Sequence, residues 1–425
     1  MVVVTAAPKA AAWSFSKSPM LHEARGARPH AVSQPNWDCG GGGAGGRMGT
    51  MLSDPAAERA RRQVVRLARS GLDAPSLLAA VAGAVQEIVR YDGAVWATVD
   101  PATILITGAL VEDLPRDSAA AFYENEYLHD DVNKFTRLAR GQRPVATAGE
   151  ATDGDLSRSR LHREVGSAFG FMGDALRAAF VVDGSCWGVA ALGRRRPEPL
   201  FSQAEVSFMA SFCRTLADGL RAAILLDALG PPSGADGVPG LVLLDPDHTV
   251  SAATPAAQAW LEELAGDYGL RASDRAPAAL RAVAARARDA GAPDGADPES
   301  APRARVRTRS GRWLVLYGLP LGAAGATGAQ TAVVIQEARP PEVAPLIVAA
   351  YGLSAREREV AQRVILGSST AEIARALFIS PYTVQDHLKA IFDKVGVRSR
   401  GELAKQVFER HYLPSRRSGF GPRTG

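Results

Sequence analysis

The segment from Tyr382 to Asp393 carries polar side chains whose spacing follows a helical period. These side chains are Tyr382, Gln385, Asp386, Lys389 and Asp393, which supply amide, carboxylate and ammonium groups to one side of a helix. Glutamine and lysine pair with base edges in the DNA major groove, and that groove admits a single helix. A helix face that is merely solvated has the same appearance, so the spacing alone leaves both interpretations open.

An apolar stripe on the other side of this segment is expected to hold the helix in place. Val384, Leu388, Ile391 and Val395 recur at spacings of four, three and four residues, as one buried helix face requires. Ser380 followed by Pro381 is a helix start, with serine as the N-cap and proline at the first helical position. A second helix is expected to begin upstream at the capping box Ser369-Thr-Ala-Glu372. Only a tight turn fits between the two helices.

Two further start signals complete a unit of four helices. Ser354 is expected to cap a helix that runs to about Leu366, and Ser399-Arg-Gly-Glu402 opens a last helix. The whole segment resembles the LuxR/FixJ-type DNA-binding domain. The residues that carry the resemblance are Leu353–Val360, Gly367, Glu372–Ala374, Leu377–Ser380, Thr383–Val384, His387–Leu388 and Lys394–Arg400. The resemblance implies an all-α helix-turn-helix domain over residues 347–412 that binds double-stranded DNA as a homodimer and contacts RNA polymerase.

The resemblance and the polar face together nominate site residues. We expect Gln385, Asp386 and Lys389 to read bases, with Tyr382 at the edge of that face. The residues expected to contact the DNA backbone are Thr370, Thr383, His387 and Lys394. The residues expected at the dimer contact are Leu403, Gln406 and Val407.

His387, Glu357 and Asp386 differ from the other polar residues of this segment. His387 lies beside the apolar stripe, so a packed histidine is the alternative role. Glu357 lies on the apolar face of its helix and is interpreted as structural, because a carboxylate there needs a partner. Asp386 departs from the family pattern and repels phosphate. A protein-interaction or signalling module that keeps the helical fold without binding DNA therefore stays open.

Length, charge and cysteine content limit how the chain can be organised. A length of 425 residues is too great for one hydrophobic core and suits two or three domains. From Leu346 onward 13 Lys and Arg face 7 Asp and Glu, a charge of +6, which leaves −2 for the remainder of a chain whose net charge is +4. No apolar run approaches about 18 residues, which argues against a membrane span. Three cysteines without paired spacing favour a reducing cytoplasm and no zinc site.

The first half of the chain is interpreted as an extension followed by a sensor. Residues 1–52 are Gly-, Ala- and Pro-rich and are expected to be disordered, with Met48 or Met51 as an alternative translation start. Residues 54–228 are expected to form a helix, two strands, a helical middle, two strands and a helix. The helical middle includes Ser118–Arg140, a hairpin turn is predicted at Asp183-Gly184, and the last helix is expected to be long and to start at Gln203. This order, with Cys186–Arg194 and the following Pro199–Ser202, resembles an α+β GAF sensor domain. A small-molecule effector pocket would be lined by Trp96, Phe122, Tyr127, Phe169, Phe171 and Trp187, unless these aromatic residues are simply core.

A linker at 229–238 is expected to lead to a second α+β domain. The pattern over residues 239–338 predicts two strands, helices and three strands. This order of elements resembles a PAS-like domain, which would be α+β. Prolines at 340, 341 and 345 predict a stiff linker over 339–346, and residues 413–425 are expected to be a disordered tail. His129 and His162 are single histidines in polar stretches, and neither has a second ligand at useful spacing. We therefore expect no metal or resident cofactor.

The sequence lacks the motifs of the common catalytic classes. No Gly-x-x-x-x-Gly-Lys-Ser/Thr phosphate loop, Gly-x-Ser-x-Gly or His-Glu-x-x-His occurs. The acidic cluster and lysine of a phosphoacceptor receiver domain are also missing. The expectation is a multidomain, non-enzymatic chain with two α+β domains and a C-terminal four-helix domain.

Overall fold

The computed structural model describes residues 55–115, 117–170, 173–227, 238–264, 276–289, 301–321 and 330–412. The chain divides into two units, Met1–Leu52 and Ser53–Gly425, and every element below belongs to the second. The expected extension, most of the expected first linker and the expected tail lie outside the described residues. Within the described ranges, no helix combines the length and apolarity that a membrane span needs.

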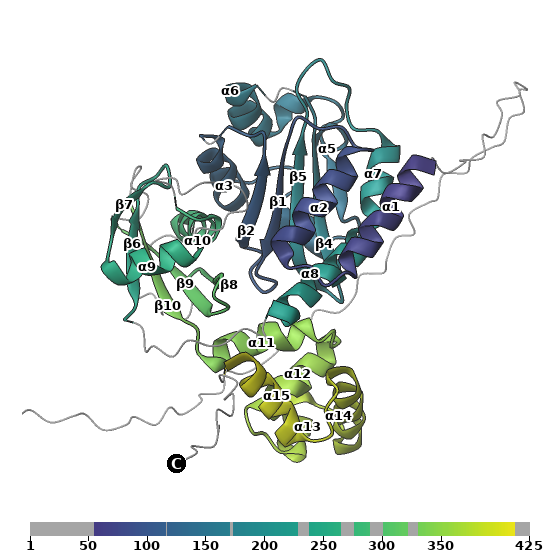
Figure 1. The fold of residues 1–425 in the computed structure, drawn as a ribbon, viewed down its shortest axis with the longest axis vertical. Coiled ribbons are helices and arrows are strands. Elements are labelled where there is room, and N and C mark those ends of the chain that lie inside the picture. The colour runs from purple at the N-terminus through teal and green to yellow at the C-terminus, as the bar shows by residue number, and fades with distance from the viewer. Residues whose placement is uncertain are drawn as a thin grey trace, which may run out of the picture. The chain divides into compact units, whose positions relative to one another are not determined.

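The first domain is built on a five-stranded antiparallel sheet with the order β2-β1-β5-β4-β3 (Figure 1). The hairpin predicted at Asp183-Gly184 joins β4 to β5. Both residues have positive φ, 49° and 73°, as a two-residue turn that matches strand twist requires. The strands are β1 (Gly93–Val99), β2 (Ile106–Glu112), β3 (Val145–Thr147), β4 (Ala175–Val182) and β5 (Ser185–Gly193). The short edge strand β3 was not anticipated, because its segment reads as a polar loop.

One face of this sheet is covered by α1 (Pro55–Ala68), α2 (Ala74–Gln86) and α8 (Cys213–Asp227) (Figure 1). The apolar residues between this face and the helices form one core, which includes Trp96 and Trp187. The single long helix expected from Gln203 is in fact two helices, α7 (Gln203–Ala210) and α8. Ser202 begins α7 with the capping box it forms with Glu205, as its sequence suggests.

The opposite face of the sheet carries shorter helices. The helix expected from Ser118 to Arg140 is divided into α3 (Ser118–Leu128) and α4 (Phe135–Arg140). The division occurs where Asp131 accepts hydrogen bonds from three backbone amides and where Asn133 has a φ of 54°. The elements that follow are α5 (Ala148–Ala151), η1 (Leu156–Arg158), the π-helical η2 (His162–Gly166) and α6 (Ser167–Phe169).

The second domain repeats this sheet topology. Its order β7-β6-β10-β9-β8 is the first sheet's order when the strands are numbered within each sheet. The five extended runs expected from the sequence are β6 (Gly240–Leu244), β7 (Val250–Ala253), β8 (Arg303–Arg307), β9 (Trp313–Pro320) and β10 (Thr331–Glu337). The helices are α9 (Pro255–Leu264) and α10 (Ala278–Asp289). Gly318 lets α10 approach β9, because a Cβ there would lie 2.7 Å from the carbonyl oxygen of Val283.

The C-terminal part is helical. It comprises α11 (Pro340–Ala350), α12 (Ala355–Ile365), α13 (Thr370–Leu377), α14 (Pro381–Val395) and α15 (Arg400–Tyr412). Most of the segment expected to be a stiff proline linker over 339–346 is helical, because it forms the first part of α11. Two of its prolines occupy the first positions of α11, where a missing N–H costs no helical hydrogen bond.

Candidate nucleic-acid interface and an apolar cavity

The two helices of the helix-turn-helix start at the predicted caps. The amide of Glu372 donates to Ser369 Oγ at 3.3 Å, and the amide of Ser369 donates to Glu372 Oε2 at 2.7 Å. At the start of α14, the amide of Thr383 donates to Ser380 Oγ at 3.0 Å. Between the helices, Phe378 takes a left-handed conformation with φ of 54°. Local hydrogen bonds thus fix both helix starts, as the sequence predicts.

The division of α14 into two faces is confirmed. Val384, Leu388, Ile391 and Val395 are buried, at 0%, 6%, 0% and 5% exposure. Gln385, Asp386 and Lys389 are exposed, and Tyr382 is 73% exposed. The helix therefore packs through its apolar stripe and presents amide, carboxylate, ammonium and phenol groups outward together.

Three residues that are expected to contact the DNA backbone lie beside this face. Thr370 begins α13, and its hydroxyl accepts a hydrogen bond from Arg400 Nη2 at 2.7 Å. The hydroxyl of Thr383 lies 2.8 Å from Ser380 Oγ. His387 is half-buried beside the apolar stripe. The Thr370 hydroxyl accepts in its bond, so its own proton remains available to a phosphate beside the backbone amides of the helix start.

Lys394 has a different environment from the other expected contacts. Its ammonium donates to Glu357 Oε2 at 2.6 Å, and the Glu357 side chain is 9% exposed. The interpretation of Glu357 as structural is thus confirmed, and Lys394 is the partner it requires. The Lys394 side chain is nonetheless 42% exposed, and an ammonium group carries three donors, so its contact to the DNA backbone stays a prediction.

The residues expected at a dimer contact also differ from one another. Leu403 is 1% exposed and belongs to the core of its own domain. Its expected role is corrected accordingly, because a side chain buried inside the monomer offers no surface to a second copy. Gln406 is half-buried and donates to the carbonyl oxygen of Val395 at 3.4 Å. The side chain of Val407 lies outside the described residues.

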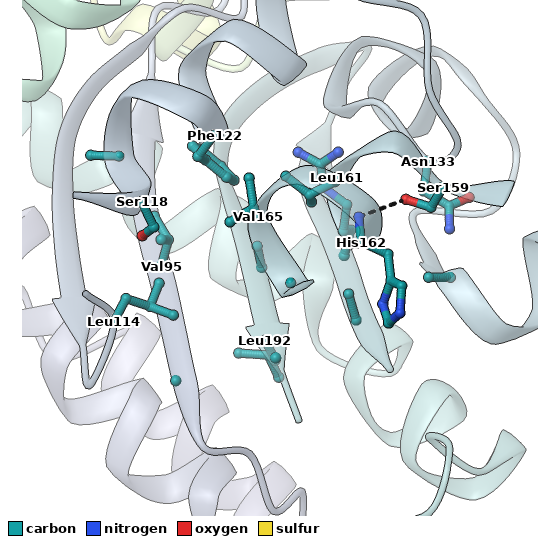
Figure 2. A pocket seen from close by; sticks show the side chains of 18 of the residues that line it. Val95, Leu114, Ser118, Phe122, Asn133, Ser159, Leu161, His162, Val165 and Leu192 are labelled. Carbon is teal, nitrogen blue, oxygen red and sulfur yellow. Dashed lines mark hydrogen bonds between the residues drawn. The ribbon is translucent and has the colours of Figure 1, made fainter. Parts of the chain in front are cut away.

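A cavity of about 170 Å³ lies on the α3 side of the first sheet. Figure 2 shows that side chains from strands, helices and the π-helical segment surround a common space. Its apolar walls include Val95, Leu114, Phe122, Leu161, Val165 and Leu192, and Ser118, Asn133, Ser159 and His162 add polar groups. Burial, followed by the nearby charge of Arg196, lowers the pKa of His162, so its imidazole is neutral at pH 7.

The aromatic residues expected to line a pocket are divided by the sheet. Phe122 lines the cavity. Trp96 and Trp187 do not, because both are fully buried on the opposite face. Tyr127 is buried with its hydroxyl accepting from the Ile106 amide at 3.0 Å, Phe169 ends α6 away from the lining, and Phe171 lies outside the described residues. Sequence reasoning missed Arg177, whose only signal is a single charge in an otherwise apolar strand.

Metal ligands do not gather in the described part of the chain: no three His, Cys, Asp or Glu side chains there could hold an ion together. His162 belongs to the cavity wall, and His129 is the C-cap of α3.

Comparisons with known proteins find a matching family and relatives for the C-terminal helices. Residues 352–407 match the family model described as bacterial regulatory proteins, luxR family. The probable transcriptional regulatory protein NarL of Mycobacterium tuberculosis is 38% identical over 61 residues, which are 14% of this chain and 28% of that protein. The transcriptional regulatory protein UhpA of Escherichia coli is 40% identical over 57 residues, which are 13% of this chain and 29% of that protein. The chain thus spans less than a third of the length of these relatives.

The comparison with solved structures covers larger shares of the chain. The VqsR LBD domain from Pseudomonas aeruginosa is 12% identical with a TM-score of 0.29 and covers 41% of this chain and 99% of that chain. The bacteriophytochrome RpBphP3 from R. palustris is 17% identical with a TM-score of 0.28 and covers 65% of this chain and 63% of that chain. These TM-scores do not establish a common fold. The sequence match and the capped, two-faced α14 concern the C-terminal helices, and residues 352–407 therefore belong to the luxR family of bacterial regulatory proteins.

Proposed function

We propose that this chain is a sequence-specific, DNA-binding transcriptional regulator. The observation that carries the proposal is the outward face of α14, within a luxR-family domain, where Gln385, Asp386 and Lys389 are exposed together. Lysine and glutamine donate to guanine and adenine edges, and aspartate accepts from cytosine. The helix would lie in the major groove, with Tyr382 at its edge. Amides at the starts of α13 and α14, with Thr370, Thr383, His387 and Lys394, would face the phosphates.

The assembly and control of the regulator belong to the same proposal. We propose that it acts as a homodimer on a roughly palindromic site and works with RNA polymerase in the cytoplasm. Gln406 stays in the proposed dimer contact, whereas the burial of Leu403 removes that side chain from it. The two preceding domains would act as a GAF-like sensor and a PAS-like spacer. Their shared sheet order and the cavity in the first domain support these roles.

A protein-interaction module is the second candidate function. It is favoured by Asp386, whose carboxylate is exposed on the same face as Lys389 and repels phosphate. Phe378 and Leu366 are also 96% and 74% exposed in this domain. Salt separates the two candidates, because phosphate contacts weaken steeply with ionic strength and apolar contacts do not.

The test is selection of bound duplexes from a random pool at one stated salt concentration. The full chain should enrich a near-palindrome. Lys389→Ala should weaken binding to that site and relax the preference at one base pair, a loss of about 1–3 kcal/mol in discrimination. Lys405→Ala removes the same charge from α15 and serves as the matched control, with base preference unchanged.

Two results would count against the proposal. Equal weakening on every sequence would make Lys389 a phosphate contact rather than a base reader. Failure of the full chain and of residues 340–425 to enrich any sequence would favour the interaction module instead.

A further inference from the structure

The cavity in the first domain has a wall chemistry that specifies its ligand. We propose that it binds a small, uncharged, largely apolar molecule with one hydrogen-bond acceptor directed at Nε of Arg177. The inference rests on the proposed function only in making this ligand the effector that the regulator senses. Binding itself stands on the geometry of the cavity.

Size and wall composition set the first constraint. Val95, Ala109 and Leu192 come from strands, while Phe122 and Val165 come from α3 and the π-helical segment. Their side chains leave about 170 Å³. An apolar cavity of about 150 Å³ in another protein holds benzene, so this one suits roughly six to ten non-hydrogen atoms.

Two carboxylates in the cavity wall, those of Asp131 and Asp174, already accept hydrogen bonds from backbone amides. Asp131 accepts from the amides of Val132 at 2.8 Å and Leu161 at 2.7 Å. Asp174 accepts from the amides of Gly149, Ala175 and Phe201 at 2.8, 2.8 and 3.0 Å. These hydrogen bonds hold the loops around the cavity and give each carboxylate oxygen a backbone partner.

Arg177 supplies the polar anchor. It is 3% exposed, its guanidinium lies 3.9 Å from the centroid of the Phe135 ring, and Nη2 donates to Glu126 Oε2. Its Nε, by contrast, is buried with no hydrogen-bond partner in the described part of the chain. A buried donor without an acceptor is unfavourable, so a ligand that supplies an acceptor removes that cost.

Charge balance excludes a charged ligand. The Glu126 carboxylate, 1% exposed, neutralises Arg177, and the guanidinium of Arg281 lies 5.4 Å from the centroid of the Tyr123 ring. Asp131 and Asp174 add two further negative charges to the wall. Lys134, 8% exposed, lies close enough to Glu126, Asp131 and Arg177 for their charges to act on its pKa, and it adds a third positive charge. Three cations thus face three carboxylates, so a ligand of either charge would add an uncompensated charge in a poorly solvated space.

Three probes of one framework test this inference: benzamide, benzoate and benzylammonium, titrated into the full chain by saturation-transfer NMR. Benzamide should bind at least about tenfold more tightly than either charged probe. Ala109→Leu should abolish benzamide binding by filling the cavity. Ala210→Leu makes the same change at an exposed site on α7 and should leave binding intact. If Ala109→Leu fails to fold, Val165→Phe fills the cavity from the helical side.

Arg177→Lys tests the acceptor interaction separately. It keeps the positive charge for Glu126 but removes the Nε donor, so benzamide should bind more weakly while toluene, which has no acceptor, should be unaffected. Three results would overturn the inference: no binding of any probe, benzoate binding as tightly as benzamide, or unchanged benzamide binding in the filled variants. DNA binding by the same preparation without probes reports on the proposed function independently. If DNA is bound and no probe is, only the inference on the cavity fails.

Discussion

Lys389 and Lys394 lie on the same helix and have different environments. Lys389 is exposed on the outward face, whereas Lys394 donates to Glu357 at 2.6 Å. The difference arises because Glu357 lies on the buried side of α12 and α14 packs against that helix. Both lysines are exposed, but Lys394 also pairs with a buried carboxylate and so stabilises the domain, which helical spacing alone does not predict.

The Glu357–Lys394 pair predicts a specific pH dependence. Burial by itself would raise the pKa of Glu357, but hydrogen bonds from Lys394 and from the Ser354 amide outweigh burial and lower it. An unfolded glutamate titrates near about pH 4.3. The stabilisation is therefore present above that pH and is lost as the pH falls through the lower native pKa.

Glu357→Gln should reproduce this loss at neutral pH. Hydrogen-exchange protection of α12 and α14 should fall below wild type at pH 7, and the difference should shrink as the pH drops below about 4. Glu359→Gln is the matched control, because Glu359 is exposed and pairs with Arg356 near the surface. A constant difference between wild type and Glu357→Gln across this range would contradict the assignment.

At the scale of elements, α14 depends on its apolar stripe. Leu388 is 6% exposed in the same core as Val384 and Ile391. Leu388→Ala should reduce the free energy of unfolding of this domain by about 2–5 kcal/mol, because it leaves a cavity between α14 and its neighbours. Hydrogen exchange of the α14 amides measures the change. Asp386→Ala, two residues away on the exposed face, should leave protection near wild type, and equal effects of both variants would argue against the helix register.

At the scale of the whole molecule, the first domain can be followed separately because it contains two buried cysteine thiols. Cys186 on β5 and Cys213 on α8 are 3% and 2% exposed. Burial raises the pKa of each thiol to about 12, so neither is a thiolate at neutral pH.

Thiol labelling should therefore report the unfolding of the first domain. In a Cys39→Ser background at pH 8, neither cysteine should react in the native chain. Both should become reactive together across the denaturant transition of the first sheet. Leu388→Ala supplies the control, since destabilising the C-terminal domain should leave the transition midpoint in place. Rapid labelling of either cysteine before the transition would contradict the burial.

The sequence by itself determined what depends on neighbours three or four residues apart. The Ser369 and Ser380 caps, the stripe through Leu388 and the Asp183-Gly184 turn are local features, and each was predicted. Their hydrogen bonds and side-chain faces follow from one segment of chain at a time.

Tertiary structure decided what depends on segments brought together from far apart. The side of the sheet on which an aromatic residue lies separates Phe122 in the cavity from Trp96 in the core. The role of Lys394 depends on Glu357, 37 residues away. The cavity brings together Val95, Val165 and Leu192. Arg177 is the proposed anchor because its buried Nε has no hydrogen-bond partner among the described residues. Burial and hydrogen-bond pairing across such distances are properties of packing, which a single stretch of sequence does not specify.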